Sequence, residues 1–321
     1  MLKAYDYAEA GQPKTEIQNA GLFQQEKGIA LKYVLNHPNS VKYDKCPVCG
    51  SERTRFIFSR WDVDYLFCDD CCSIFVPVRE DTIHDYLAME EMKKLRTGEE
   101  YQRQAGIRRA DIWDEQVMWA QYRIYRYLGR NTGLDVIDYG NRYFGSVNRF
   151  RESGICSRYE LRDSILPMTT EKVENADVIL YMNQLQHERT PVLTLKKLKT
   201  SLKEDGILIL NTRLGSGFDI LTLKGSMDSV FPYEHIMLPS RKGLEMLLEQ
   251  AGFELLEITT PGTRDMESVL RNRERIEESN FFVKYLLMTA DEETLADFQQ
   301  FLQKSGLSSF AQVVAKVRKQ G

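Results

Sequence analysis

Four cysteines form the clearest chemical pattern in this sequence. Cys46 and Cys49 are separated by two residues, Cys68 and Cys71 by two more, and 18 residues lie between the pairs. Each pair predicts a tight knuckle that directs two sulfur atoms toward one point, and four sulfur ligands suit tetrahedral zinc. We therefore predict that Cys46, Cys49, Cys68 and Cys71 bind a zinc ion.

The predicted zinc site is structural in character. Four thiolates leave no open coordination position, so we do not expect the metal to activate water. The segment 54–67 alternates like two short strands, which predicts the hairpin of a zinc ribbon. Cys72 is a fifth thiol and the alternative to Cys71, although the pair spacing favours Cys71. Five of the six cysteines lie within 27 residues, which indicates a metal site in a reducing compartment rather than a disulfide framework.

A second candidate site follows the apolar run that begins at Leu134. The run ends at Asp138, and Gly140 and Asn141 come directly after it. In doubly wound α/β proteins the first strand, a glycine turn and a helix N-terminus form the nucleotide-binding corner. The same pattern also fits a strand-to-helix turn that binds nothing. We predict Asp138, Gly140 and Asn141 as cofactor-binding residues.

Polar residues at the ends of later strands extend this predicted site. Such domains often place an acid after the second strand to hold ribose hydroxyls, and either Glu160 or Asp163 fits that position. Asn183 and Gln184 follow a buried strand at 176–181 and are expected to line the cofactor. His187 stands at the same edge, where a lone histidine is more often structural.

A possible proton acceptor lies in the long glycine-rich connection over 214–240. Tyr233, Glu234 and His235 are adjacent there. A histidine beside a carboxylate and a phenol can act as a general base near neutral pH. We predict these three residues as catalytic, with a histidine that only stabilises the loop as the alternative.

These residues need a sheet to bring them together. Strand, helix and strand patterns alternate from 134 to 259, which predicts an α/β fold with a doubly wound, Rossmann-like parallel sheet. Helices are expected at 192–206, ended by Gly206, at 241–251, and at the C-terminus. We expect a helical segment at 1–42, the zinc ribbon at 43–80, a helical linker at 81–130, the Rossmann-like domain at 131–262 and a helical region at 263–321.

Composition narrows the range of functions. The net charge of −4 argues against a general nucleic-acid binder. No apolar run approaches the roughly 20 residues that span a bilayer, and the first residues lack a signal-peptide core. We therefore expect a cytoplasmic protein. An apolar patch at 281–287 packs either on the domain or on a second subunit, so a homo-oligomer stays open.

The motifs together resemble a known family. The order of zinc ribbon, helical linker, IDYG, ADVILYMNQLQH, LKEDGILILNTR, PYEHIMLPS and GLEMLLEQAGF is similar to class I S-adenosylmethionine-dependent methyltransferases with an N-terminal zinc ribbon. The resemblance covers most of residues 43–262. The PYEH segment resembles that of sugar C-methyltransferases, which act on nucleotide-linked keto-sugars.

The resemblance implies S-adenosylmethionine as cofactor and a sugar or nucleotide-sugar of cell-surface carbohydrate metabolism as substrate. His235 would remove a proton beside a ketone, with Tyr233 or Glu234 assisting, and the enolate would attack the cofactor methyl group. Asp138 and Gly140 match the corner that holds the methionine part of the cofactor.

Two alternatives follow from departures from the family pattern. Arg142 and Phe144 occupy positions where small residues are usual, which also fits a catalytically degenerate fold that serves as a binding or scaffold module. An RNA- or DNA-modifying enzyme that reads nucleic acid with its ribbon is a further alternative, against which the acidic composition weighs.

Overall fold

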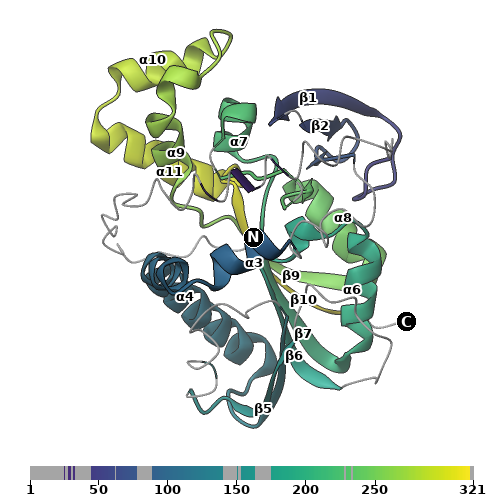
Figure 1. The fold of residues 1–321 in the computed structure, drawn as a ribbon. Helices are drawn as coiled ribbons and strands as arrows, with labels where there is room; N and C mark the ends of the chain where they lie inside the picture. Colours follow the sequence, from purple (N-terminus) through teal and green to yellow (C-terminus); the bar gives the residue numbers. More distant parts are fainter. Residues whose placement is uncertain are drawn as a thin grey trace.

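The computed structural model describes residues 25, 28–29, 32, 45–61, 63–77, 89–139, 150, 153–162, 175–227, 229–232 and 234–318 (Figure 1). For residues 96 and 102–114 it describes the helical backbone alone.

A six-stranded sheet forms the centre of the molecule. Its order is β5 (Cys156–Arg162), β4 (Leu134–Tyr139), β6 (Ala176–Met182), β7 (Leu202–Arg213), β10 (Phe310–Val317) and β9 (Phe253–Thr259). The first four strands are parallel, and β10 runs antiparallel to both β7 and β9. The near-continuous apolar sequences of β6 and β7 follow from their burial on both faces. The predicted α/β fold with a Rossmann-like sheet is confirmed, and β10 adds two antiparallel pairings to the expected parallel strands.

Helices cover the two faces of this sheet, because side chains alternate between faces along each strand. On one face α4 (Glu99–Leu128) packs Val117 and Ile124 into a cluster with alternate residues of the strands, among them Val136, Val178 and Ile209. On the other face α6 (Pro191–Thr200) and α8 (Arg241–Ala251) cover Ile137, Ile179 and Leu208 (Figure 1).

A buried ion pair fastens α4 to the last strand of the sheet. Arg123 on α4 donates from Nε and Nη2 to Glu257 Oε1 on β9, at 2.9 and 2.7 Å. Both side chains are almost completely buried. The hydroxyl of Tyr127 donates to the other oxygen of Glu257 at 2.9 Å.

A second, four-stranded sheet joins the N-terminal ribbon to the main domain. Its order is β1 (Thr54–Arg60), β2 (Val63–Cys68), β3 (Ile74–Phe75) and β8 (Met237–Leu238). The hairpin expected at 54–67 is confirmed, with Thr54 opposite Cys68. Because β8 comes from the region expected at 131–262, the ribbon is built into that domain rather than tethered to it.

Helices α7, α9, α10 and α11 lie together at one end of the molecule, whereas α3 lies beside α4 (Figure 1). The bounds are α3 (Glu90–Thr97), η1 (Leu185–His187), α7 (Phe218–Leu223), η2 (Lys224–Ser226), α9 (Asp265–Arg271), η3 (Arg273–Arg275), α10 (Phe281–Thr289) and α11 (Glu292–Ser305). None of the described helices combines the length and apolar character that a membrane crossing requires.

Two expectations about elements are wrong. The helix expected over 192–206 ends at Thr200, and β7 begins at Leu202. Gly206 does not end a helix: it lies in the irregular start of β7, where an added Cβ would sit 2.9 Å from the Ala176 carbonyl oxygen. The helix expected at the C-terminus is instead the strand β10. It pairs with β7 on one edge and with β9 on the other, and its Val and Ala side chains are largely buried.

Two expected helices fall largely outside the described residues. Within the N-terminal segment, residues 25, 28, 29 and 32 are helical, and within 146–153 Phe150 is helical.

Candidate functional site

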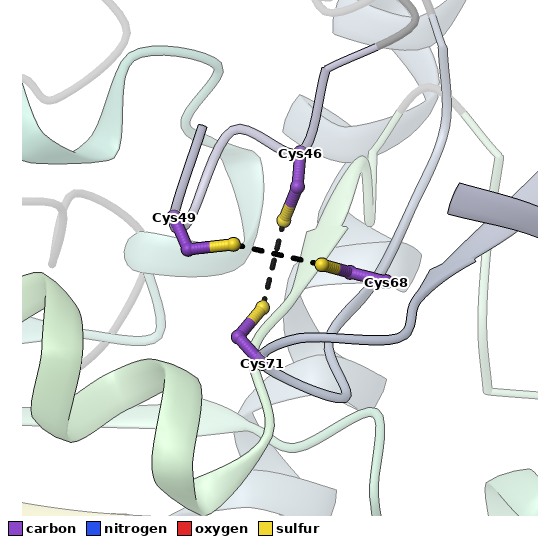
Figure 2. A group of neighbouring side chains, drawn as sticks. All are labelled: Cys46, Cys49, Cys68 and Cys71. Carbon is purple, nitrogen blue, oxygen red and sulfur yellow. Dashed lines mark hydrogen bonds between the residues drawn. The ribbon is translucent and has the colours of Figure 1, made fainter. Parts of the chain in front are cut away.

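The four predicted zinc ligands meet at one point. Their sulfur atoms all lie within 4.8 Å of one another, with 3.6 Å between Cys46 and Cys71 and 3.5 Å between Cys49 and Cys68. Figure 2 shows the four side chains converging from the two knuckles. Zn–S bonds of about 2.3 Å in a tetrahedron place sulfurs about 3.8 Å apart, so the cluster fits zinc with little adjustment.

The thiols of this cluster hydrogen-bond to one another in pairs. A bound divalent metal would take the place of the shared protons. The hydrogen bond with Cys46, together with those to Ser73, lowers the pKa of Cys71 to about 5 against the opposing effect of burial. The same bond raises the pKa of Cys46, and burial raises that of Cys49 to about 11. Cys72 is exposed and stands outside the group of four, so the alternative ligand is not supported. The fit is to a closed, structural site.

A second concentration of polar groups lies at the carboxyl ends of β4 and β5. Asp138 is completely buried near the end of β4, and the hydroxyl of Tyr159 donates to its Oδ2 at 2.5 Å. Glu160 on β5 lies beside Ile137 in the parallel register and accepts from Arg162 Nε at 2.8 Å. Two carboxylates on adjacent strands at this edge are acceptors of the kind that an amino group and ribose hydroxyls require.

The turn after β6 carries the next predicted residues. Asn183 adopts φ 55°, a left-handed conformation that Asn tolerates better than most residues. Its backbone N–H donates to Asn211 Oδ1 at 2.6 Å, and Asn211 Nδ2 donates to Gln116 on α4 at 3.0 Å. The amide of Gln184 donates to the carbonyl of Met182 at 3.2 Å. The network fixes this turn against both β7 and α4.

Two histidines meet just beyond the turn. The rings of His187, at the end of η1, and His235, before β8, have centroids 5.7 Å apart. The N–H of Phe231 donates to His235 Nδ1 at 3.0 Å, so the neutral His235 ring carries its hydrogen on Nε2. His187 Nδ1 contacts the carbonyl oxygen of Glu234, which only accepts, so the lone pair of the neutral His187 ring lies on Nε2. The side-chain nitrogen of Gln186 lies 3.5 Å from this Nε2, a longer contact than the 3.0 Å between Phe231 N and His235 Nδ1. The two rings are complementary, one a donor and the other an acceptor.

His235 is neutral over the physiological pH range. Burial, with smaller contributions from His187 and Arg213, lowers its pKa to about 3, against the opposing effect of Glu234. Its ring therefore works as a neutral imidazole.

The structure places Asp138 and Glu160 on the adjacent strands β4 and β5, Asn183 and Gln184 directly after β6, and Glu234 and His235 before β8. Glu160 is level with Ile137 rather than with Asp138, so the side chains of Asp138 and Glu160 point to opposite faces of the sheet. Gly140, Asn141, Asp163 and Tyr233 lie outside the described residues. The roles of all these residues stay predictions.

Local sequence indicates two residues of this site only weakly. A lone histidine such as His187 is more often structural, but its place shortly after β6 is where ligands bind in such sheets. Gln116 lies 95 residues from Asn211 in sequence, and no local pattern indicates that they touch.

Comparisons with known proteins agree with this fold. A family model described as a methyltransferase domain matches residues 102–258, just under half of the chain. A tRNA U34 carboxymethyltransferase of Photobacterium profundum is 27% identical over 139 residues, which are 41% of each chain. That of a Pseudomonas aeruginosa strain is 37% identical over 84 residues, 26% of each chain. The match therefore spans less than half the length of these relatives.

Solved methyltransferase structures resemble the chain more distantly. Haemonchus contortus phospholethanolamine N-methyltransferase 2, solved with S-adenosylhomocysteine, is 13% identical with a TM-score of 0.45, over 77% of this chain and 62% of that one. The part of the chain that matches a known family is therefore residues 102–258, by the methyltransferase-domain model.

Proposed function

We propose that the protein is an S-adenosylmethionine-dependent methyltransferase that acts on a keto-sugar or nucleotide-linked keto-sugar. The observation that carries the proposal is the pair of complementary histidines at the carboxyl edge of a methyltransferase-like sheet. A carbon acid beside a ketone needs a proton acceptor and a hydrogen-bond donor to the ketone oxygen, and this pair offers both.

The cofactor would lie along the ends of β4, β5 and β6. Asp138 and Glu160 would accept hydrogen bonds from its amino and ribose groups, and the turn at Asn183 and Gln184 would line its adenosyl part. When bound, S-adenosylmethionine supplies an electrophilic methyl group.

The tautomers divide the acid–base work. His187 Nε2 takes the proton from the carbon beside the ketone, while His235 Nε2–H donates to the ketone oxygen as it gains charge. His187 would hold the abstracted proton and His235 would stabilise the enolate oxygen, so that the enolate carbon could accept the methyl group that bound S-adenosylmethionine would supply. The sequence assigned the proton-accepting role to His235, but the hydrogen bond from Phe231 N–H occupies its lone pair in this geometry.

Calorimetry tests the cofactor part of the proposal. S-adenosylmethionine and its demethylated product should bind, and Glu160→Gln should weaken binding about tenfold, because one charged acceptor is lost. Glu254→Gln is the matched control, because Glu254 is an exposed residue of β9 that forms an ion pair with Lys316. No binding at millimolar concentration would refute the proposal and favour the scaffold alternative.

Deuterium uptake tests the proton transfer. A keto-sugar substrate with S-adenosylhomocysteine should exchange its acidic carbon-bound hydrogen with D₂O. His187→Gln should abolish exchange, and His235→Gln should slow it. Exchange at full rate in His187→Gln would contradict the division of roles.

A second candidate is modification of tRNA, which the curated relatives suggest by name. Among the described residues of the ribbon, however, the exposed cations pair with acids: Arg53 with Asp70, Arg55 with Asp69 and Lys45 with Glu52. This candidate requires salt-sensitive binding of unmodified tRNA. Absence of such binding at low salt would remove it.

A further inference from the structure

We propose that the four-cysteine ribbon positions the His235 segment, defined as residues 231–240, and that Tyr65 is the positioning residue that reaches it. Metal binding in the ribbon would then order one wall of the candidate active site without any role in the chemistry. The inference relies on the proposed function only in giving His235 a catalytic role.

The ribbon strands hold the middle of the His235 segment. The hydroxyl of Tyr65, a completely buried residue of β2, donates to the carbonyl oxygen of His235 at 3.2 Å. The N–H of Val76, directly after β3, donates to the carbonyl of Ile236 at 2.8 Å. Beyond it, β3 pairs with β8 through Ile74 opposite Leu238. The backbone on the C-terminal side of His235 is thus an extension of the ribbon sheet.

The metal-binding knuckles hold the end of the same segment. Ser240 Oγ donates to the carbonyl of Cys71, and Ser240 N–H donates to Ser73 Oγ at 3.0 Å. Ser73 Oγ lies 3.2 Å from the sulfur of Cys71, so one hydroxyl links a predicted ligand to the His235 segment. Ser240 also caps α8 by accepting from Gly243 N–H at 2.9 Å.

Helix α8 lies against both knuckles. Lys242 Nζ donates to the carbonyl of Asp70 at 2.7 Å, and Gln250 Nε2 donates to that of Val48 at 3.2 Å. Gly243 permits the approach, because an added Cβ would lie 2.3 Å from Ser73 Oγ and 3.0 Å from Val48. Loss of the knuckle geometry therefore removes partners from residues 240–250.

The opposite side of the segment contacts η1, which follows β6 in the chain. Ile236 N–H donates to the carbonyl of Gln186 at 3.0 Å, and the carbonyl of Glu234 contacts His187. The His235 segment therefore lies between the ribbon and the edge that carries the predicted cofactor site. If the ribbon loosens, the geometry of His235 relative to His187 is expected to change first, because the segment then keeps its contacts on one side and loses those on the other.

Hydrogen exchange on the full-length protein tests the proposal without substrate or cofactor. With zinc bound, the hydrogen-bonded amides of His235, Ile236 and Ser240 should be protected. Chelation of the metal, verified by atomic absorption, should speed their exchange at least tenfold while β6 and β7 keep their protection. Unchanged protection at 235–240 would overturn the proposal. Equal loss across the whole sheet would also overturn it, because the metal would then stabilise the entire chain.

Point variants separate positioning from general stability. Tyr65→Phe should speed exchange at His235 and Ile236 about 3- to 10-fold and shift the ¹⁵N signals that report the Nε2–H tautomer of His235. Tyr127→Phe, which removes a similar hydroxyl from Glu257 far from the segment, is the matched control. If the two variants leave the His235 signals equally unchanged, Tyr65 is not a positioning residue.

A cysteine pair provides the metal control. Cys71→Ser should lower zinc content and deprotect the His235 segment, whereas exposed Cys72→Ser should change neither. The chelation experiment covers the case in which Cys71→Ser does not fold. Failure of cofactor binding would refute the proposed function and leave these exchange results intact, so the two ideas fail separately.

Discussion

Replacement of Asp219 by Asn should stabilise the protein in a pH-dependent way. Asp219 lies in the first turn of α7 and is 3% exposed, and its Oδ1 accepts from the N–H of Ile220 at 2.7 Å. Burial and, to a smaller extent, nearby Asp265 raise its pKa from 3.8 to about 7 against the lowering effect of Arg213. An amide of the same shape keeps the hydrogen bond and removes the buried charge.

The magnitude follows from the pKa. Between pH 3.8 and 7 the folded state binds the proton of Asp219 more tightly than the unfolded state, so its contribution to stability falls as pH rises. The resulting penalty is about 2 kcal/mol at pH 5, about 3 kcal/mol at pH 6 and about 4 kcal/mol at pH 8. Asp219→Asn should recover most of it at pH 8 and less than about 1 kcal/mol at pH 4.

Urea unfolding at pH 4, 5, 6 and 8 measures the difference between variant and parent. Asp297→Asn, at an exposed position of α11, controls for the general effect of removing an acid. A difference that is constant with pH, or that grows toward low pH, would refute the assignment of a buried, proton-binding carboxyl to Asp219.

Three further outcomes are expected. Arg123→Met should lower the free energy of unfolding by about 3–5 kcal/mol, because it leaves Glu257 charged and buried, and the double variant with Glu257→Leu should recover much of that loss. Urea unfolding of both variants decides this, and equal stability of the single variant and the parent would contradict it. Gly243→Ala should cost about 1–3 kcal/mol, because its Cβ would overlap Ser73 Oγ; Gly28→Ala, with no atom within 4 Å of the added Cβ, is the control for the same thermal-unfolding measurement. Because its pKa is low, His235 binds a proton less tightly in the folded state than in the unfolded state. The free energy of unfolding should therefore fall by about 1.4 kcal/mol for each pH unit from pH 6.5 toward pH 3. His235→Gln should remove this pH dependence, as measured by urea unfolding. A slope that persists in His235→Gln would place it on another group.

Local sequence was sufficient for the metal cluster. The two C-x2-C pairs fix the knuckles within a few residues, and their convergence at 3.5 to 3.6 Å needed only a hairpin of the expected length. The strands at 134–139 and 176–182 were equally predictable, because mainly apolar runs in an α/β pattern fit buried parallel strands.

Contacts distant in sequence were not predictable in the same way. The final segment has helical and strand potential, and β10 is a strand because β7 and β9 offer it partners on both edges. The end of α6 moved from Gly206 to Thr200 for the same reason, since pairing with β6 begins at Leu202. Tertiary pairing outweighed local propensity in both cases.

The sequence alone determined the four-cysteine cluster and predicted a nucleotide-type edge, because residue type and short spacing carry both signals. Tertiary structure decided which residues face each other there. It placed His187 against His235 across 48 positions of sequence and Tyr65 against the same segment, because the ribbon completes its sheet with β8. Hydrogen-bond partners then set the tautomer of each ring, and no spacing in the sequence carries that information.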